Sequence, residues 1–144
     1  MSTWSDDARA RLAAAGQRLG AARAEVIDFF AAQKCCRGAQ EIHEALAARG
    51  SHIGLASVYR AVDSLVDCGA VLRIDVGDGI ARYEPVRSGH GHHHHLVCDG
   101  CGKLEAFEDA ALERAIEAVE RGTGFDVATH DVVLRGACAD CRAA

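Results

Sequence analysis

The chain has 144 residues, of which 49% are hydrophobic, enough for one compact domain or two small domains with their own cores. No apolar run could cross a bilayer and the N-terminus has no signal-peptide pattern, so we expect a cytoplasmic protein with no membrane partner. The net charge of −5 excludes a uniformly basic nucleic-acid binder.

The charge is unevenly distributed along the chain. Residues 1–87 balance 11 Lys/Arg against 11 Asp/Glu, whereas residues 88–144 contain 5 Lys/Arg and 10 Asp/Glu. The change falls near residues 85–89, which include the only proline. We therefore predict a first domain over 1–86, a hinge over 87–91 and a second domain over 92–144.

Four helices and a hairpin are predicted in the first domain. Hydrophobic spacing indicates helices over 8–19, which contains Leu12 and Leu19, and over 23–33, 39–50 and 54–69. The hairpin has arms 71–76 and 80–86 around the turn "GDG". Helices followed by a hairpin predict an N-terminal winged-helix DNA-binding domain, whose helix from about Leu55 would enter the major groove.

The surface of that helix is suited to DNA despite the net charge. The segment 45–62 has no acidic residue but contains two arginines and a histidine. At its front, Ser57, Tyr59 and Arg60 can bond phosphates or base edges. Taken singly, Tyr59 is equally well a core residue and Arg60 a solvated surface charge.

Two Cys-x-x-Cys pairs stand in the second domain, at Cys98 and Cys101 and at Cys138 and Cys141. Four cysteines in this pattern predict a tetrahedral Zn²⁺ bound by four thiolates, and such a closed site is structural rather than catalytic. Two disulfides conflict with a reducing compartment, and a redox pair would not need the second pair.

The run of four histidines, residues 92–95, leads into a predicted strand that ends at Cys98. Side chains of a strand alternate, so this run can supply two metal sites, one on each face. Further ligands could come from a helix over 108–122, which has Leu112, Ile116 and Val119 inward, and from a strand over 125–138. The candidates are Glu113, His130, Glu84 and Cys36. Taken alone, each is better explained as a surface glutamate, a hydrogen-bonded histidine or a buried cysteine, and only their combination favours metal sites.

The stretches "AQEIHEAL", "GLASVYRAVDSL", "HHHHLVCDGCGKLEAFED" and "CADC" resemble the ferric uptake regulator family of metal-sensing repressors over essentially the whole chain. The resemblance implies an α+β protein with an N-terminal winged helix and a C-terminal α/β dimerisation domain. It also implies a homodimer that binds double-stranded, AT-rich palindromic operators when its sensing metal is bound.

The resemblance also implies the roles of individual residues. A structural zinc site falls on Cys98, Cys101, Cys138 and Cys141. A sensory hinge site falls on Glu84, His93, His95 and Cys36. A second core site falls on His92, His94, Glu113 and His130. DNA contacts fall on Arg18, Arg23, Ser57, Tyr59 and Arg60.

The chain departs from the family pattern at three places. Residues 20–23, "GAAR", open the second helix without the threonine that the family often has. Val86 stands where a zinc-sensing hinge usually has a cysteine, and Glu84 matches the iron-type hinge. Cys36 stands at a position that is usually histidine.

Thiolate with imidazole favours zinc, whereas carboxylate with imidazole favours Fe²⁺ and Mn²⁺. We therefore expect a structural Zn²⁺ and a regulatory Zn²⁺, with Fe²⁺ or Mn²⁺ as the alternative at the hinge. The chain would be a zinc-sensing repressor of metal-uptake genes, similar to the zinc uptake regulator branch, and not an enzyme. An iron(II) sensor and a peroxide sensor share this fold, and a zinc storage or chaperone protein is the alternative from another class. A metallohydrolase is disfavoured because no His-Glu-x-x-His motif is present.

Overall fold

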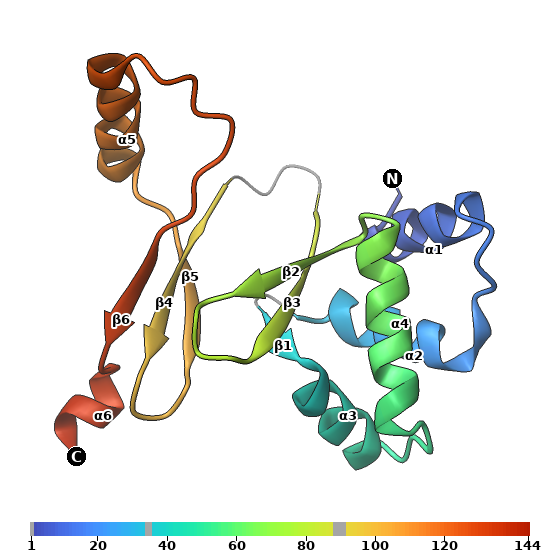
Figure 1. The fold of residues 1–144 in the computed structure, drawn as a ribbon. Coiled ribbons are helices and arrows are strands. Elements are labelled where there is room, and N and C mark those ends of the chain that lie inside the picture. The colour runs from blue at the N-terminus through green and yellow to red at the C-terminus, as the bar shows by residue number, and fades with distance from the viewer. Residues whose placement is uncertain (1, 34–35, 88–91) are drawn as a thin grey trace. The chain divides into compact units, whose positions relative to one another are not determined.

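The computed structural model describes residues 2–33, 36–87 and 92–144 (Figure 1). The chain divides into two compact units, Met1–His90 and Gly91–Ala144, which are described separately below. Most of the expected hinge, residues 88–91, lies outside the described residues, as does Cys35.

The N-terminal unit combines helices with a small antiparallel sheet. Its strands run in the order β1-β3-β2, so that β3 lies in the centre and pairs with both neighbours. The two-residue β1 is too short to give a sequence pattern and was not predicted. The elements in chain order are α1 (Trp4–Ala14), α2 (Gly20–Ala31), β1 (Arg37–Gly38), α3 (Ala39–Ala48), α4 (Leu55–Asp67), β2 (Val71–Asp75) and β3 (Ala81–Pro85).

The first helix begins and ends earlier than its predicted range of 8–19. Thr3 and Asp6 form a reciprocal capping box that starts α1 at Trp4. Gly16 has a φ of 71°, a left-handed conformation that ends the helix. The prediction that Leu19 belongs to this helix is wrong, because Leu19 directly precedes α2 and is 40% exposed.

One hydrophobic core holds the four helices and the sheet of this unit together. Helices α2 and α4 pack against each other and against α1 and α3. The sheet contributes Val71 and Tyr83 from its inner face. The largest fully buried side chains of the unit are Phe30, Leu12, Ile27, Ile42, Leu65, Val26, Val58 and Val62.

The C-terminal unit is built on β4 (His94–Cys98), the central strand of a second sheet. Strand β5 (Leu104–Phe107) pairs with it antiparallel, and β6 (Val133–Gly136) pairs with it parallel. Helix α5 (Ala110–Thr123) makes the crossover between β5 and β6, and the short α6 (Ala139–Ala143) follows. The predicted strand over 125–138 is therefore too long, and His130 lies in the loop that precedes β6.

The side chains of helix α5 are less buried than the sequence predicts. Its side chains Leu112, Ile116 and Val119 were expected inward, yet the described chain buries no residue of α5, and Val119 is 63% exposed. The helix itself is well formed, because the Asp109 carboxylate accepts the Leu112 amide proton at 2.9 Å. The expectation is therefore wrong for Val119, whereas Leu112 and Ile116 are half-buried, and the described residues leave the outer part of this apolar stripe exposed.

The α+β class, with a winged helix followed by an α/β unit, is confirmed. In the described ranges, every helix is too short or too polar to span a bilayer.

Two leucines give a matched test of the N-terminal core. Leu65 is fully buried and Leu72 is 52% exposed. Leu65→Ala should lower the free energy of unfolding by about 2–5 kcal/mol, because it leaves a cavity in a packed core. Leu72→Ala should change it by less than about 1 kcal/mol. Urea unfolding followed by the fluorescence of Trp4, the single tryptophan, reports on this unit. Equal losses would show that Leu65 is not a core residue.

Candidate metal centres and nucleic-acid interface

Four cysteines from distant parts of the C-terminal unit form the four-cysteine cluster (Cys98, Cys101, Cys138 and Cys141). Cys98 ends β4, Cys101 lies in the turn after it, Cys138 caps α6 and Cys141 lies within α6. The four sulfur atoms all lie within 4.8 Å of one another. None of the cysteines described is in a disulfide. The sequence pattern and the fold thus bring the same four thiols together.

The spacing of the sulfurs fits tetrahedral zinc. Zinc–sulfur bonds of about 2.3 Å at tetrahedral angles put two sulfurs about 3.8 Å apart. The Sγ atoms of Cys101 and Cys138 are separated by 3.8 Å. Gly100 leaves the necessary room, because a Cβ there would lie 3.1 Å from the Cys141 sulfur. The sequence already indicates a turn eased by glycine at this position, because Gly100 lies inside "CDGC".

Hydrogen bonds shift the pKa values of Cys98 and Cys141 in opposite directions. The backbone amide of Cys138 donates to Cys98 Sγ at 3.3 Å, and with the Cys101 amide it lowers the pKa of Cys98 to about 6. The thiol of Cys141 hydrogen-bonds to Cys98 and then to Cys138, which raises its pKa to about 12. Successive ionisation of four adjacent thiols builds repulsion, so a bound cation is what allows all four to be thiolates.

The second group is the His–Glu cluster (His92, His94, Glu113 and His130). Nε2 of His94 lies 2.6 Å from Glu113 Oε1, and Nε2 of His130 lies 2.9 Å from Glu113 Oε2. The ring of His92 lies 4.5 Å from that of His94 and 4.4 Å from that of His130, between centroids. All four ligand atoms lie within 4.8 Å of one another. Three imidazoles and a carboxylate form a donor set that suits a divalent transition metal.

Hydrogen bonds orient one ring of the His–Glu cluster and keep its carboxylate ionised. The backbone amide of Val132 donates to Nδ1 of His94 at 3.2 Å, which fixes the buried ring and directs Nε2 toward α5. The hydrogen bond from His94, joined by that from His130, lowers the pKa of Glu113 below its usual value of 4.5. Glu113 is therefore ionised at neutral pH, as a metal ligand must be.

The predicted hinge ligands occur as two pairs, one in each unit. In the N-terminal unit, Cys36 directly precedes β1 and Glu84 lies in β3, and Cys36 Sγ donates to Glu84 Oε2 at 3.1 Å. In the C-terminal unit, the rings of His93 and His95 lie 5.1 Å apart. Since His92 pairs with His94 and His93 with His95, the expected alternation of the histidines is confirmed.

Helix α4 presents the side chains expected to read DNA. Tyr59 is 46% exposed, so the alternative that it is a core residue is wrong. Arg60 is also exposed, and its Nη2 donates to Ser57 Oγ at 3.1 Å. The amphipathic and cationic groups of this helix therefore face solvent at its N-terminal half.

The two other predicted DNA contacts differ from each other. Arg18 lies in the exposed loop between α1 and α2. Arg23 is half-buried, and its guanidinium donates to the Arg18 carbonyl, to Gln17 Oε1 at 2.8 Å and to Ser64 Oγ at 3.0 Å. Arg23 thus binds the loop after α1 to helix α4, a contact that sequence spacing could not reveal.

These features define a winged-helix protein that also clusters metal-ligating side chains. The sequence profile of the Ferric uptake regulator family matches residues 14–135, and the chain belongs to this family. Members are transcriptional regulators that bind metals, so the expectation that the chain is not an enzyme is confirmed.

Two relatives and one solved structure illustrate the similarity. The chain is 36% identical to the Ferric uptake regulation protein of Bacillus subtilis over 104 residues, 72% of this chain and 70% of that protein. It is also 36% identical to the Zinc uptake regulation protein of Mycobacterium tuberculosis over 133 residues, 91% and 99% of the two chains. The crystal structure of the Vibrio cholerae ferric uptake regulator superposes with a TM-score of 0.80 at 29% identity, covering 92% of this chain and all of that one.

The split acidity of the four-cysteine cluster gives a pH prediction. In zinc-free folded protein, the first thiolate should appear near pH 6 and disappear as the pH falls below that value, because folding lowers the pKa of Cys98. Thiolate absorbance near 240 nm measures it. The control is the same protein in urea, where thiols should ionise near the usual 9.0. Identical titrations of the folded and unfolded protein would contradict the assigned hydrogen bonds.

Proposed function

We propose that the chain is a cytoplasmic, zinc-sensing transcriptional repressor that controls metal-uptake genes. It would bind AT-rich palindromic operators as a homodimer, with structural Zn²⁺ in the four-cysteine cluster and regulatory Zn²⁺ at the hinge. Family membership and a winged helix that exposes Tyr59 and Arg60 support the DNA-binding part. The observation that carries the regulatory part is the short contact between Cys36 and Glu84, which puts two candidate ligands together in the DNA-binding unit.

The proposed organisation is a DNA-binding domain over 1–86, a hinge over 87–91 and a metal-binding dimerisation domain over 92–144. Cys36 and Glu84 would hold the sensed metal from the first domain, and His93 and His95 from the second. A bound metal supplies a cross-link between ligands on two domains. These ligands would then hold the two reading helices of the dimer at the separation of half-sites about one helical turn apart. Metal and DNA binding are reciprocal in such a scheme.

The choice of zinc depends on the donor atoms. Relatives named for zinc and for iron are equally identical to this chain, so overall identity does not choose between them. A thiolate with imidazoles favours zinc, and the buried Cys36 beside Glu84 can supply that thiolate. The buried carboxylate of Glu84 in the same pair favours Fe²⁺ or Mn²⁺, which makes an iron(II)-sensing repressor the second candidate.

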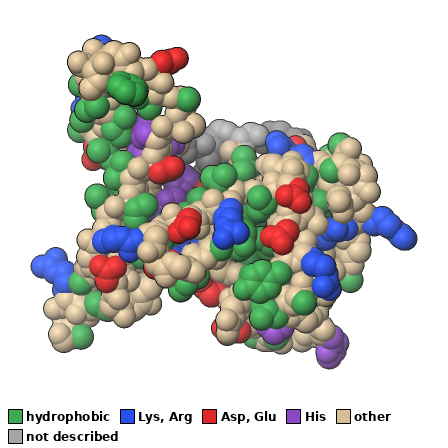
Figure 2. All heavy atoms as spheres, in the orientation of Figure 1, with side chains coloured by type: hydrophobic (Ala, Val, Ile, Leu, Met, Phe, Trp, Pro, Cys, Tyr) green, Lys and Arg blue, Asp and Glu red, His purple; other side chains and the backbone are tan. Residues whose placement is uncertain are grey.

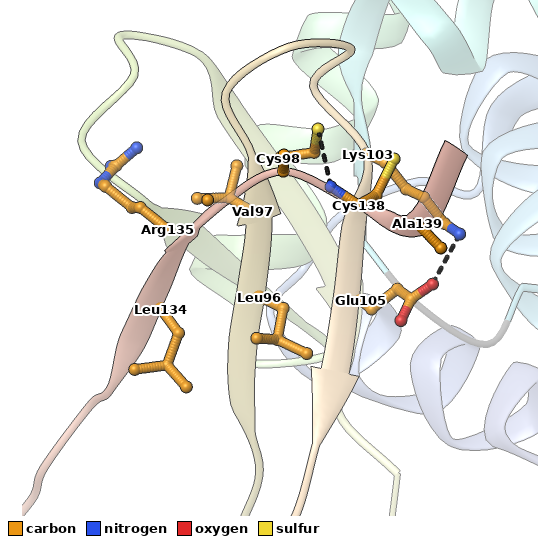
Figure 3. A pocket seen from close by; sticks show the side chains of 11 residues that line it. Leu96, Val97, Cys98, Lys103, Glu105, Leu134, Arg135, Cys138 and Ala139 are labelled. Carbon is orange, nitrogen blue, oxygen red and sulfur yellow. Dashed lines mark hydrogen bonds and ion pairs between the residues drawn. The ribbon is translucent and has the colours of Figure 1, made fainter. Parts of the chain in front are cut away.

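The homodimer is supported by two uncovered apolar surfaces of the C-terminal unit. One is the stripe of α5, where hydrophobic side chains gather at the surface (Figure 2). The other is the sheet face with Leu96 at 39% and Leu134 at 49% exposed, which line an open pocket of about 280 Å³ (Figure 3). Apolar surface that one copy cannot cover is stabilised when a second copy buries it.

The metal assignment is tested by operator binding in metal buffers. Fluorescence anisotropy with an AT-rich palindromic duplex should show affinity at least about tenfold higher with trace free Zn²⁺ than without metal. Anaerobic Fe²⁺ should need a much higher free concentration, because a thiolate site binds zinc more tightly. The reverse order would make the chain an iron sensor. Equal binding with and without every metal would contradict metal-dependent repression.

Variants in the same assay separate the metal sites. His93→Ala combined with His95→Ala should abolish the metal-dependent gain and leave a folded dimer. Cys98→Ser should instead lower the free energy of unfolding of the C-terminal unit, because a structural zinc contributes folding free energy. His43→Ala, on α3, serves as the matched histidine control and should behave like the wild type. If the double histidine variant and Cys98→Ser failed in the same way, the division into sensory and structural sites would be wrong.

The proposed dimer surface is tested by introducing charge. Val119→Glu and Leu134→Glu should each convert the dimer into monomers in sedimentation equilibrium, because a carboxylate would be buried without a partner. Leu72→Glu, on an exposed leucine of the N-terminal unit, is the control and should leave the dimer intact. Dimers that survive both α5 and sheet substitutions would place the interface elsewhere.

A further inference from the structure

Arg87 joins the end of the wing to the end of a helix far away in sequence. It lies two residues after the end of β3 and is half-buried. Its Nη2 donates to the carbonyl oxygens of Phe30 at 2.8 Å, Ala31 at 3.2 Å and Gln33 at 3.1 Å. The last carbonyls of a helix have no amide partner within the helix, and a cation there also complements the helix dipole. Arg87 therefore caps α2 from 54 residues or more away in the chain.

Trp4 and Ala70 complete this arrangement. The guanidinium carbon of Arg87 lies 5.6 Å from the centroid of the Trp4 ring, a cation–π contact. Trp4 Nε1 donates to the Ala70 carbonyl at 3.2 Å, and the same oxygen accepts the Val86 amide proton at 2.9 Å. The Arg87 clamp, as we name Arg87 with Trp4, Ala70 and the C-terminus of α2, thus ties α1, α2 and the two strands of the wing at one corner.

The clamp residues lie close in sequence to both candidate hinge ligands of the N-terminal unit. Gln33, which accepts from Arg87, is three residues before Cys36, and Arg87 is three residues after Glu84. The two ligands contact each other at 3.1 Å. The clamp therefore fixes the flanks of both segments to α2, and α2 packs directly against the reading helix α4 in the hydrophobic core.

We propose that Arg87 is a positioning residue that couples metal binding by Cys36 and Glu84 to the placement of α4. The inference deepens the proposed function and rests on it. Metal binding would fix Cys36 and Glu84 in one coordination geometry. Because the clamp holds the segments next to these ligands to the end of α2, α2 would move with them as one rigid body. Without the clamp, the ligand segments could adjust to the metal while α2 and α4 stayed as they were.

The contrast with Arg9 supplies a matched control. Arg9 also bonds α2, through the side chain of Asp28 at 3.0 Å, but this ion pair is exposed and involves neither the wing nor the hinge ligands. Its loss should cost little stability. Arg9→Gln therefore removes an arginine that contacts α2 without removing the link between α2 and β3.

The experiment compares full-length Arg87→Gln with Arg9→Gln and the wild type. Operator affinity is measured by anisotropy with and without buffered Zn²⁺, and with Fe²⁺ if that metal activates the wild type. In Arg87→Gln, the metal-dependent gain should fall by about tenfold, while affinity without metal changes by less than about twofold. Metal addition should change the Trp4 emission of the wild type and of Arg9→Gln, and not that of Arg87→Gln.

Two milder variants test the clamp even if Arg87→Gln does not fold. Arg87→Lys keeps the charge at the helix terminus but loses the planar fork, so it should recover part of the gain. Trp4→Phe keeps an aromatic ring but loses the bond to Ala70, and it should lower the gain by a smaller factor. A wild-type gain in Arg87→Lys and Trp4→Phe, or in a folded Arg87→Gln, would show that the clamp only caps α2 and would overturn the proposal. If the wild type itself showed no gain, the proposed function would fail first.

Discussion

The alternation of side chains along β4 is the constraint on which the rest of the C-terminal unit depends. An extended backbone directs His92 and His94 to one side and His93 and His95 to the other. Pairing with β5 and β6 holds the strand from His94 onward on both edges, so His94 and His95 are fixed on opposite faces. One short segment therefore serves two sets of ligands, and Cys98 at its end starts a third.

Electrostatic interactions determine which side chains of the two metal-ligating clusters can be ionised when no cation is bound. Four thiols within 4.8 Å cannot all ionise alone, because each new thiolate repels those already formed. Backbone amides stabilise the first thiolate, at Cys98, and the neighbouring thiol of Cys141 is then held protonated. The His–Glu cluster instead combines one carboxylate with three imidazoles, and the hydrogen bonds from His94 and His130 keep the Glu113 carboxylate ionised. Both arrangements suit the metal binding that the family shares.

The two units also differ in how completely they are packed. The N-terminal unit has a buried core drawn from every helix and from its sheet, as a domain that must present α4 rigidly requires. The C-terminal unit leaves the stripe of α5 and part of its sheet exposed. In the proposed repressor, this incomplete packing is the surface on which the second copy docks, and the rigid unit is the part that metal binding positions.

The sequence by itself determined the features that depend on nearby residues. Hydrophobic periodicity predicted the four N-terminal helices and α5, because a helix repeats over a few residues, and the Cys-x-x-Cys pairs and histidine run predicted which donors would cluster. The match to the ferric uptake regulator family could also be recognised from these motifs.

The tertiary structure decided what depends on distant residues. The last strand is shorter than predicted, and His130 lies in the loop before it. Strands β1 and β5 had no clear sequence pattern, and Val119 is exposed. The tertiary structure brought the Cys138 amide to Cys98 and the Arg87 guanidinium to α2. These contacts join segments 40 residues or more apart, and no local pattern encodes such a pairing, because it forms only when separate elements bury a common surface.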